Sequence, residues 1–136
     1  MKEKHIIAHM EAAHVYAKLS SCTRLKVGCL IIKNDTPIGL GYNGTPEGWD
    51  NCCEGPTGLT LPEVSHAEEN AFSKVTRSHE SSEGASLFVT IAPCLPCATD
   101  IVRNKIKEVF YGELYRNDDG LKYLEKAGIP TRQIKV

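Results

Sequence analysis

The sequence contains His66-Ala67-Glu68-Glu69-Asn70-Ala71 and, further along the chain, Pro93-Cys94-Leu95-Pro96-Cys97. His66, Cys94 and Cys97 are residues that bind zinc, and three protein ligands leave the fourth tetrahedral position open for a water molecule. An open position is the mark of a catalytic zinc rather than a structural one. Glu68 is not needed as a ligand, so its carboxylate is free for proton transfer. The two stretches therefore predict a catalytic zinc site shared by two segments of the chain.

The spacing within each stretch predicts that both begin a helix. Cys94 and Cys97 lie three residues apart, so at the start of a helix they fall on one face and both reach one ion. Pro93 suits a helix entrance, where its missing N–H costs nothing. The positive end of the helix dipole, together with the metal, favours the ionised sulfurs.

The histidine stretch predicts a second helix, from Ala67 to about Val75, with Ser65 as its N-cap. Residues two apart in a regular helix point about 200° away from each other. His66 and Glu68 therefore share one site only if His66 lies at the mouth of the helix, before the first regular turn.

Two simpler interpretations of the motifs are weaker. A lone Cys-x-x-Cys is also found in redox pairs and in structural zinc knuckles, and a lone His-x-Glu occurs by chance. A structural zinc site would need a fourth Cys or His nearby and would have no use for Glu68. The combination favours the catalytic interpretation.

Length and composition restrict the classes of protein that the chain can be. Its 136 residues predict a single domain, residues 1–136, with one core. A formal net charge of −1 argues against the broad basic face that nucleic-acid binding requires. The sequence has no long apolar run, and its N-terminal stretch lacks the apolar segment of a signal peptide. We therefore expect no membrane partner and a cytoplasmic protein, in the host cytoplasm if a phage encodes it, with its six cysteines as ligands or free thiols.

The remaining sequence alternates between helix and strand signals. Apolar residues at helical spacing predict a first helix over Lys4–Leu19, and the Gly- and Pro-rich stretch Asn43–Pro62 predicts a long functional loop. The other expected elements are strands at Val27–Lys33 and Ile38–Tyr42 joined by the Asn34-Asp35 turn, a strand at Ala85–Ile91, a helix from Cys94 to about Asn104, a strand at Glu108–Tyr111, a helix at Gly120–Lys126 and a strand at Thr131–Val136. Helices between the later strands require parallel pairing there. The result is an α/β fold with a mixed five-stranded sheet covered by helices on both faces.

On such a fold, the two zinc stretches resemble those of the cytidine and deoxycytidylate deaminase superfamily. One branch, the deoxycytidylate (dCMP) deaminases, is also resembled at Ser21-Cys22-Thr23-Arg24, Val27-Gly28, Gly41-Tyr42-Asn43-Gly44-Thr45-Pro46, Asn51-Cys52 and Thr90. The resemblance extends from the first helix to Gly128. It implies a cytidine deaminase-like three-layer α/β/α sandwich and zinc-dependent hydrolytic conversion of dCMP to dUMP and ammonia, which feeds dTMP synthesis.

The resemblance also implies roles for individual residues. His66, Cys94 and Cys97 would bind Zn²⁺, and Glu68 would carry protons. Substrate-binding roles fall to Asn43 for the sugar hydroxyl, Arg24 for the 5′-phosphate, and Lys26, Tyr115 and Asn70. All of these except Arg24 have an alternative structural role: a turn residue at Asn43, a solvated surface pair at Lys26 and Tyr115, and support of the helix entrance at Asn70.

Partners and a possible second metal site follow from the same resemblance. Members of the family are commonly hexamers that respond to dCTP and dTTP, so we expect a homo-oligomer and these two effectors. Larger phage relatives carry an insertion between the positions of Cys53 and His66 that completes a second, structural zinc site. The short stretch here has no spare histidine, so we expect Cys22, Cys52 and Cys53 to be free thiols rather than ligands.

Other functions share the same zinc stretch. A tRNA-base deaminase would be expected to show a basic groove and stacking aromatic residues, whereas this chain has one Trp. A deaminase of another nucleotide or of a free nucleoside is an alternative on the same fold. A free-nucleoside deaminase would not need Arg24, so the dependence of activity on the substrate phosphate separates it from a dCMP deaminase. A catalytically silent zinc-binding assembly protein would tolerate the same ligands but would not need Glu68.

Overall fold

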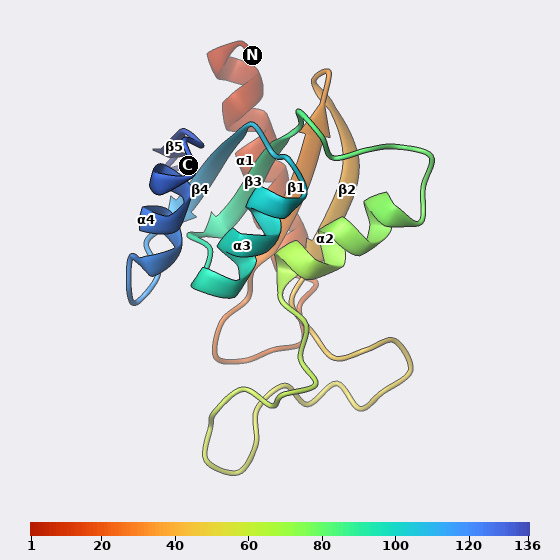
Figure 1. The fold of residues 1–136 in the computed structure, drawn as a ribbon. Helices are drawn as coiled ribbons and strands as arrows, with labels where there is room; N and C mark the ends of the chain where they lie inside the picture. Colours follow the sequence, from red (N-terminus) through yellow and green to blue (C-terminus); the bar gives the residue numbers. More distant parts are fainter.

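The computed structural model describes residues 1–136 and contains four helices and five strands (Figure 1). In chain order these are α1 (Glu3–Ala17), β1 (Gly28–Lys33), β2 (Thr36–Tyr42), α2 (Ala67–Thr76), β3 (Ser86–Ile91), α3 (Leu95–Arg103), β4 (Glu108–Glu113), α4 (Asp119–Lys126) and β5 (Thr131–Gln133). Every expected helix and strand is present, with bounds that differ by a few residues. The largest difference is at β5, which ends at Gln133 instead of Val136.

The five strands form one mixed sheet in the order β2-β1-β3-β4-β5. The β1–β2 hairpin is antiparallel, and its turn residues Asn34 and Asp35 have the positive φ angles of a tight two-residue connection. Strand β1 also pairs antiparallel with β3, whereas β3, β4 and β5 are parallel to one another. The predicted mixed five-stranded α/β fold is confirmed.

Helices cover both faces of the sheet and create two hydrophobic clusters. On one face, α1 places Ile6, Met10 and Ala13 against side chains of β1, β3 and β4. On the other face, α2, α3 and α4 bury the larger cluster, which includes Ala71, Ile101 and Leu124. The expected three layers are thus present, with a single helix on one side and three on the other (Figure 1).

The long loop between β2 and α2 lies at the end of the sheet where α2 and α3 begin (Figure 1). It contains a small turn of its own, in which the Leu61 N–H donates to the Cys53 carbonyl at 2.7 Å and the Gly55 N–H to the Leu59 carbonyl at 2.9 Å. The loop therefore has a backbone structure of its own next to the starts of α2 and α3.

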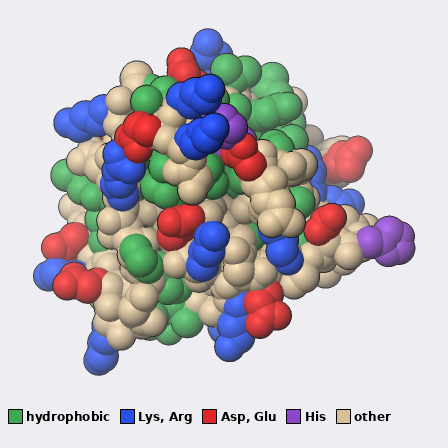
Figure 2. Space-filling model, turned by 90° about the horizontal axis from the view of Figure 1, so that it is seen from above, with side chains coloured by type: hydrophobic (Ala, Val, Ile, Leu, Met, Phe, Trp, Pro, Cys, Tyr) green, Lys and Arg blue, Asp and Glu red, His purple; other side chains and the backbone are tan.

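The surface carries interspersed charges. On the face shown in Figure 2, acidic and basic side chains alternate, in agreement with the formal net charge of −1. None of the four helices has the length and hydropathy needed to cross a membrane.

Close packing of α1 on β1 depends on a glycine. A Cβ atom at Gly28 would lie 2.1 Å from the Ala13 carbonyl oxygen and 2.8 Å from the Ala17 nitrogen, both backbone atoms of α1. We expect Gly28→Ala to lower the free energy of unfolding by about 1–3 kcal/mol, because the helix must shift to make room. Urea denaturation followed by circular dichroism measures this effect. Gly44→Ala is the matched control, since no atom lies within 4 Å of the added carbon, and equal losses in the two variants would contradict the account.

Candidate active site and metal centre

The starts of α2 and α3 meet at one end of the sheet (Figure 1). His66 is the N-cap of α2 and Cys94 is the N-cap of α3, and both have extended backbones, with φ −76°, ψ 158° and φ −71°, ψ 170°. The prediction that His66 precedes the first regular turn is confirmed. Its extended backbone lets its side chain point to the same site as Glu68, although the two residues are only two apart.

The helix start at His66 is held by a hydrogen bond from its backbone to a side chain. The His66 N–H donates to the Glu69 carboxylate at 2.7 Å, one half of a capping box. The prediction that Ser65 is the cap is wrong. Ser65 is still extended and pairs with Gly44 through two backbone hydrogen bonds of 2.8 and 3.1 Å, so the N-cap is the next residue, His66, while the helix begins at Ala67 as predicted.

The ligand atoms of His66, Cys94 and Cys97 form one cluster. His66 Nδ1 lies 3.4 Å from Cys94 Sγ and 3.3 Å from Cys97 Sγ, and all three ligand atoms lie within 4.8 Å of one another. Tetrahedral zinc with Zn–N and Zn–S bonds of ordinary length would separate nitrogen and sulfur by about 3.5 Å. The donor set and its spacing therefore fit a zinc ion with one remaining coordination position.

The electrostatics of the cluster favour an anionic sulfur. Hydrogen bonds from the Cys97 thiol and from His66 lower the pKa of Cys94 to about 4. The Cys94 sulfur in turn raises the pKa of His66 to about 9 and raises that of Cys97. A thiolate is thus available at the position where a metal cation would bind.

Glu68 is a buried carboxyl group beside this cluster. The residue is 4% exposed, and burial raises its pKa to about 7. It does not belong to the group of ligand atoms. A carboxyl group that exchanges protons near neutral pH, next to but outside the ligand set, has the properties of a general acid–base.

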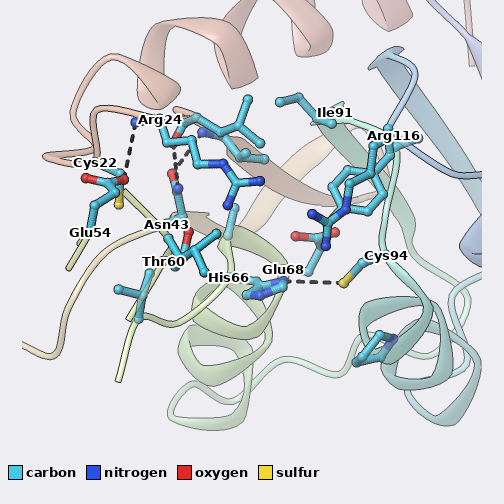
Figure 3. Close-up of a pocket in the computed structure, with 18 residues that line it drawn as sticks. Cys22, Arg24, Asn43, Glu54, Thr60, His66, Glu68, Ile91, Cys94 and Arg116 are labelled. Carbon is cyan, nitrogen blue, oxygen red and sulfur yellow. Dashed lines mark hydrogen bonds between the residues drawn. The ribbon is translucent and has the colours of Figure 1, made fainter. Parts of the chain in front are cut away.

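A cavity of about 460 Å³ opens onto His66, Glu68 and Cys94. Arg24, from the segment between α1 and β1, and Arg116, from the segment after β4, lie on opposite sides of it (Figure 3). The Arg116 guanidinium carbon lies 5.4 Å from the centre of the Tyr115 ring, and Tyr115 also lines the cavity. The cavity therefore combines a metal-binding end with two cationic side chains.

The sequence analysis anticipated Arg24 and Tyr115 but missed Arg116. The available signal was its position directly after Tyr115, beyond the carboxyl end of β4, which runs parallel to β3. The carboxyl ends of parallel strands meet at one edge of a sheet, where ligands bind in α/β folds.

Asn43 lines the cavity and also fixes one of its walls. Its Oδ1 accepts a hydrogen bond from the Val27 N–H at 2.8 Å, and its Nδ2 donates to the Leu25 carbonyl at 2.8 Å. Its side chain therefore holds the segment that follows Arg24.

Lys26 and Asn70 lie outside this cavity. Lys26 Nζ donates to the Ser20 carbonyl, and Asn70 Nδ2 donates to the Tyr42 carbonyl at 2.9 Å, which ties α2 to the end of β2. Asn70 lines a second, more polar cavity of about 580 Å³ together with Asn43, Lys74 and Arg77.

Cys22 and Cys53 are joined in a disulfide, so the expectation of free thiols at these two positions is wrong. The two residues are 2% and 1% exposed and form a small buried cluster with Val64, against which Leu61 packs. In this cluster the long loop packs Cys53 and Val64 against Cys22, which brings together two sulfurs that lie 31 residues apart in sequence. Cys52 remains a free, exposed thiol.

The disulfide also bears on the second zinc site. Cys22, Cys53 and Glu54 lie close enough together to form a metal-binding group. Zinc requires ionised thiolates as ligands, and two sulfurs joined to each other do not provide them. In this structure the disulfide connects the two segments that a second metal would otherwise connect.

Comparison with known sequences places the site in a known family. The family model of the cytidine and deoxycytidylate deaminase zinc-binding region matches residues 3–113. The deoxycytidylate deaminase of Saccharomyces cerevisiae is 37% identical over 91% of this chain and 43% of its own length, and that of enterobacteria phage T4 is 32% identical over 88% of this chain and 84% of its own. The chain spans less than half the length of the yeast relatives that it matches.

A solved structure agrees over almost the whole chain. The dCMP deaminase of cyanophage S-TIM5, in complex with dCMP and dUMP, is 39% identical, with a TM-score of 0.96 over 98% of this chain and 99% of that one. The apo form of the same cyanophage protein gives a TM-score of 0.89. The chain therefore belongs to the zinc-binding cytidine and deoxycytidylate deaminase family.

Proposed function

We propose that the protein hydrolyses dCMP to dUMP and ammonia. The observation that carries this proposal is the buried Glu68 carboxyl beside the three ligand atoms, in a cavity with two guanidinium groups. The similarity to relatives named deoxycytidylate deaminase, and to a structure that contains dCMP and dUMP, supports the same substrate. Release of ammonia from dCMP by the purified protein tests the proposal, and a silent assembly protein would release none.

In this proposal His66, Cys94 and Cys97 hold the zinc ion. When bound, zinc acts as a Lewis acid and makes a water molecule acidic enough to serve as a nucleophile near neutral pH. Glu68 accepts a proton from the attacking water and delivers it to ring nitrogen N3, which makes C4 more electrophilic. Glu68 then helps to protonate the amine that leaves from C4 as ammonia, and the carbonyl of uracil remains.

The substrate phosphate is assigned to Arg24 and Arg116. Guanidinium groups present forked donors that match phosphate oxygens, and these two lie on opposite sides of the cavity (Figure 3). Tyr115 supports the second group by stacking under Arg116. A dianionic phosphate would thus be recognised by charge from two directions.

Asn43 remains our candidate for the sugar hydroxyl. Its amide already bonds to Leu25 and Val27, but each of its polar atoms has capacity for one more hydrogen bond. For Asn70 the contact with the Tyr42 carbonyl supports the structural alternative over direct contact with dCMP. Lys26 lies outside the cavity and donates to the Ser20 carbonyl, which argues against a direct contact of Lys26 with dCMP.

We also propose that the chain forms a homo-oligomer that responds to dCTP and dTTP, as the family resemblance implies. The second cavity supports an effector site, because Lys74 and Arg77 offer positive charge for a triphosphate beside polar groups. The molar mass in solution tests the oligomeric state.

Comparing Glu68→Ala with His66→Ala separates the chemistry from metal binding. Glu68→Ala should keep its zinc and lose deamination by a factor of about 10²–10⁴, because only the proton carrier is removed. His66→Ala should lose zinc affinity as well as activity, since two thiolates leave the ion under-coordinated. Zinc analysis and the absorbance change on dCMP conversion measure both. Loss of zinc from Glu68→Ala would make Glu68 a ligand and would contradict the assignment.

Phosphate recognition predicts a preference for dCMP over deoxycytidine. Removing one cation, in Arg24→Ala or Arg116→Ala, should lower kcat/KM for dCMP by about 10- to 100-fold, since a charge-assisted hydrogen bond contributes about 1.5–3 kcal/mol. Turnover of deoxycytidine should change little. Arg103→Ala is the matched control, because Arg103 lies on the exposed surface of α3 and pairs with Asp100. Equal turnover of dCMP and deoxycytidine by the unaltered protein would indicate a nucleoside deaminase instead.

A further inference from the structure

The segment that carries Arg24 has no helix or strand of its own. Residues 21–26 lie between α1 and β1 and are mostly exposed. They are attached to the long loop by the Cys22–Cys53 disulfide and by the Glu54 side chain, two neighbouring ties that we call the loop clamp. A further hydrogen bond joins Ser21 Oγ to the Asn51 carbonyl at 3.2 Å.

The Glu54 carboxylate binds two consecutive backbone N–H groups, those of Thr23 and Arg24. Its Oε1 accepts hydrogen bonds from the Thr23 hydroxyl at 2.9 Å and the Thr23 N–H at 3.3 Å, and its Oε2 accepts one from the Arg24 N–H at 3.2 Å. The Thr23 hydroxyl lowers the pKa of Glu54, so the carboxylate is ionised at neutral pH. Both oxygens are thus engaged by the segment's backbone and hydroxyl groups.

The Arg24 guanidinium itself remains available. It forms no hydrogen bond or salt bridge within the protein, and it points into the cavity. Glu54 also lines the cavity, but it contacts the Arg24 backbone on the side away from the guanidinium (Figure 3). An acidic side chain this close to an arginine in the structure can form an ion pair with the guanidinium. Here Glu54 holds the peptide instead and leaves the positive charge for a ligand.

We propose that Glu54, together with the Cys22–Cys53 disulfide, is a positioning residue that fixes Arg24 for recognition of the substrate's phosphate. This inference rests on the proposed function. Its physical basis is preorganisation: a long side chain on a loose segment loses conformational freedom when it binds, whereas a segment ordered beforehand loses less. The loop clamp is itself ordered, because Cys53 and Glu54 belong to the turn that is closed by the backbone hydrogen bonds from Leu61 to Cys53 and from Gly55 to Leu59.

The test compares Glu54→Ala and Glu54→Gln with Glu63→Ala in the zinc-loaded protein. Glu63 is an exposed acidic residue of the same loop that forms no hydrogen bond through its side chain. Glu54→Ala should raise KM for dCMP by about 10-fold with little change in kcat, since it removes binding shared by ground and transition states. Glu54→Gln should recover part of this loss, because its carbonyl oxygen still accepts hydrogen bonds. Glu63→Ala should match the unaltered protein.

A double-mutant cycle distinguishes positioning from general support of the fold. In the Arg24→Ala background, adding Glu54→Ala should have no further effect on the preference for dCMP over deoxycytidine, because the group being positioned is gone. Additive losses would overturn the proposal. Equal losses for dCMP and deoxycytidine in Glu54→Ala would also overturn it, because they would indicate damage to the whole site.

The disulfide is tested by the double variant Cys22→Ala/Cys53→Ala, which keeps small apolar side chains in the buried cluster. Its KM for dCMP should rise while turnover of deoxycytidine is preserved. Unchanged KM for dCMP in this variant and in Glu54→Ala would overturn the inference but leave the proposed function intact. Failure of the unaltered protein to deaminate dCMP would overturn both.

Discussion

The site depends on one constraint: the two segments that supply the ligand atoms must change from extended to helical backbone at neighbouring points. His66 and Cys94 are both N-caps, and their extended φ and ψ angles turn the side chains toward each other instead of along their helices. One residue further into either helix, the same side chain would point elsewhere. The sheet fixes the relative positions of these two helix starts, because β3 leads directly into the cysteine stretch and β2 packs against α2.

The close packing of α2 on β2 restricts the position of the first turn of α2. A Cβ atom at Gly41 would lie 2.4 Å from the Ala67 carbonyl oxygen and 2.5 Å from the Ala71 nitrogen. The first turn of α2 therefore lies directly on the strand, which fixes the height of His66 and Glu68 relative to the sheet. Glu68, in this first turn, is 4% exposed, and its burial is what raises the pKa of its carboxyl group.

The fold was largely predictable because its determinants are local. Apolar spacing in α1, the hairpin turn at Asn34-Asp35 and the alternation of later strands and helices each specify an element from nearby residues. The ligand set was predictable for the same reason, since its spacing within each stretch carries the chemistry. The start of α2 at Ala67 was predicted, but its N-cap was misplaced at Ser65, because pairing of that residue with Gly44 depends on a distant part of the chain.

Long-range contacts account for the features that the sequence did not reveal. Cys22 and Cys53 are brought together by a buried cluster that the long loop forms with the segment after α1, so the positions of the cysteines in the sequence gave no reason to prefer a disulfide over free thiols. Arg116 becomes part of the cavity only because β4 lies next to β3. Asn43 was predicted at the site, but its hydrogen bonds to Leu25 and Val27 could not be predicted, because they depend on how the segment between α1 and β1 lies against the end of β2.

A crystal structure of the zinc-loaded protein with dUMP would locate the metal, the proton carrier and the phosphate together. We expect zinc bound by His66, Cys94 and Cys97, a Glu68 oxygen within about 3 Å of ring nitrogen N3, and the phosphate between Arg24 and Arg116. A Glu68 carboxylate bound to the metal, or a phosphate away from both arginines, would contradict this assignment.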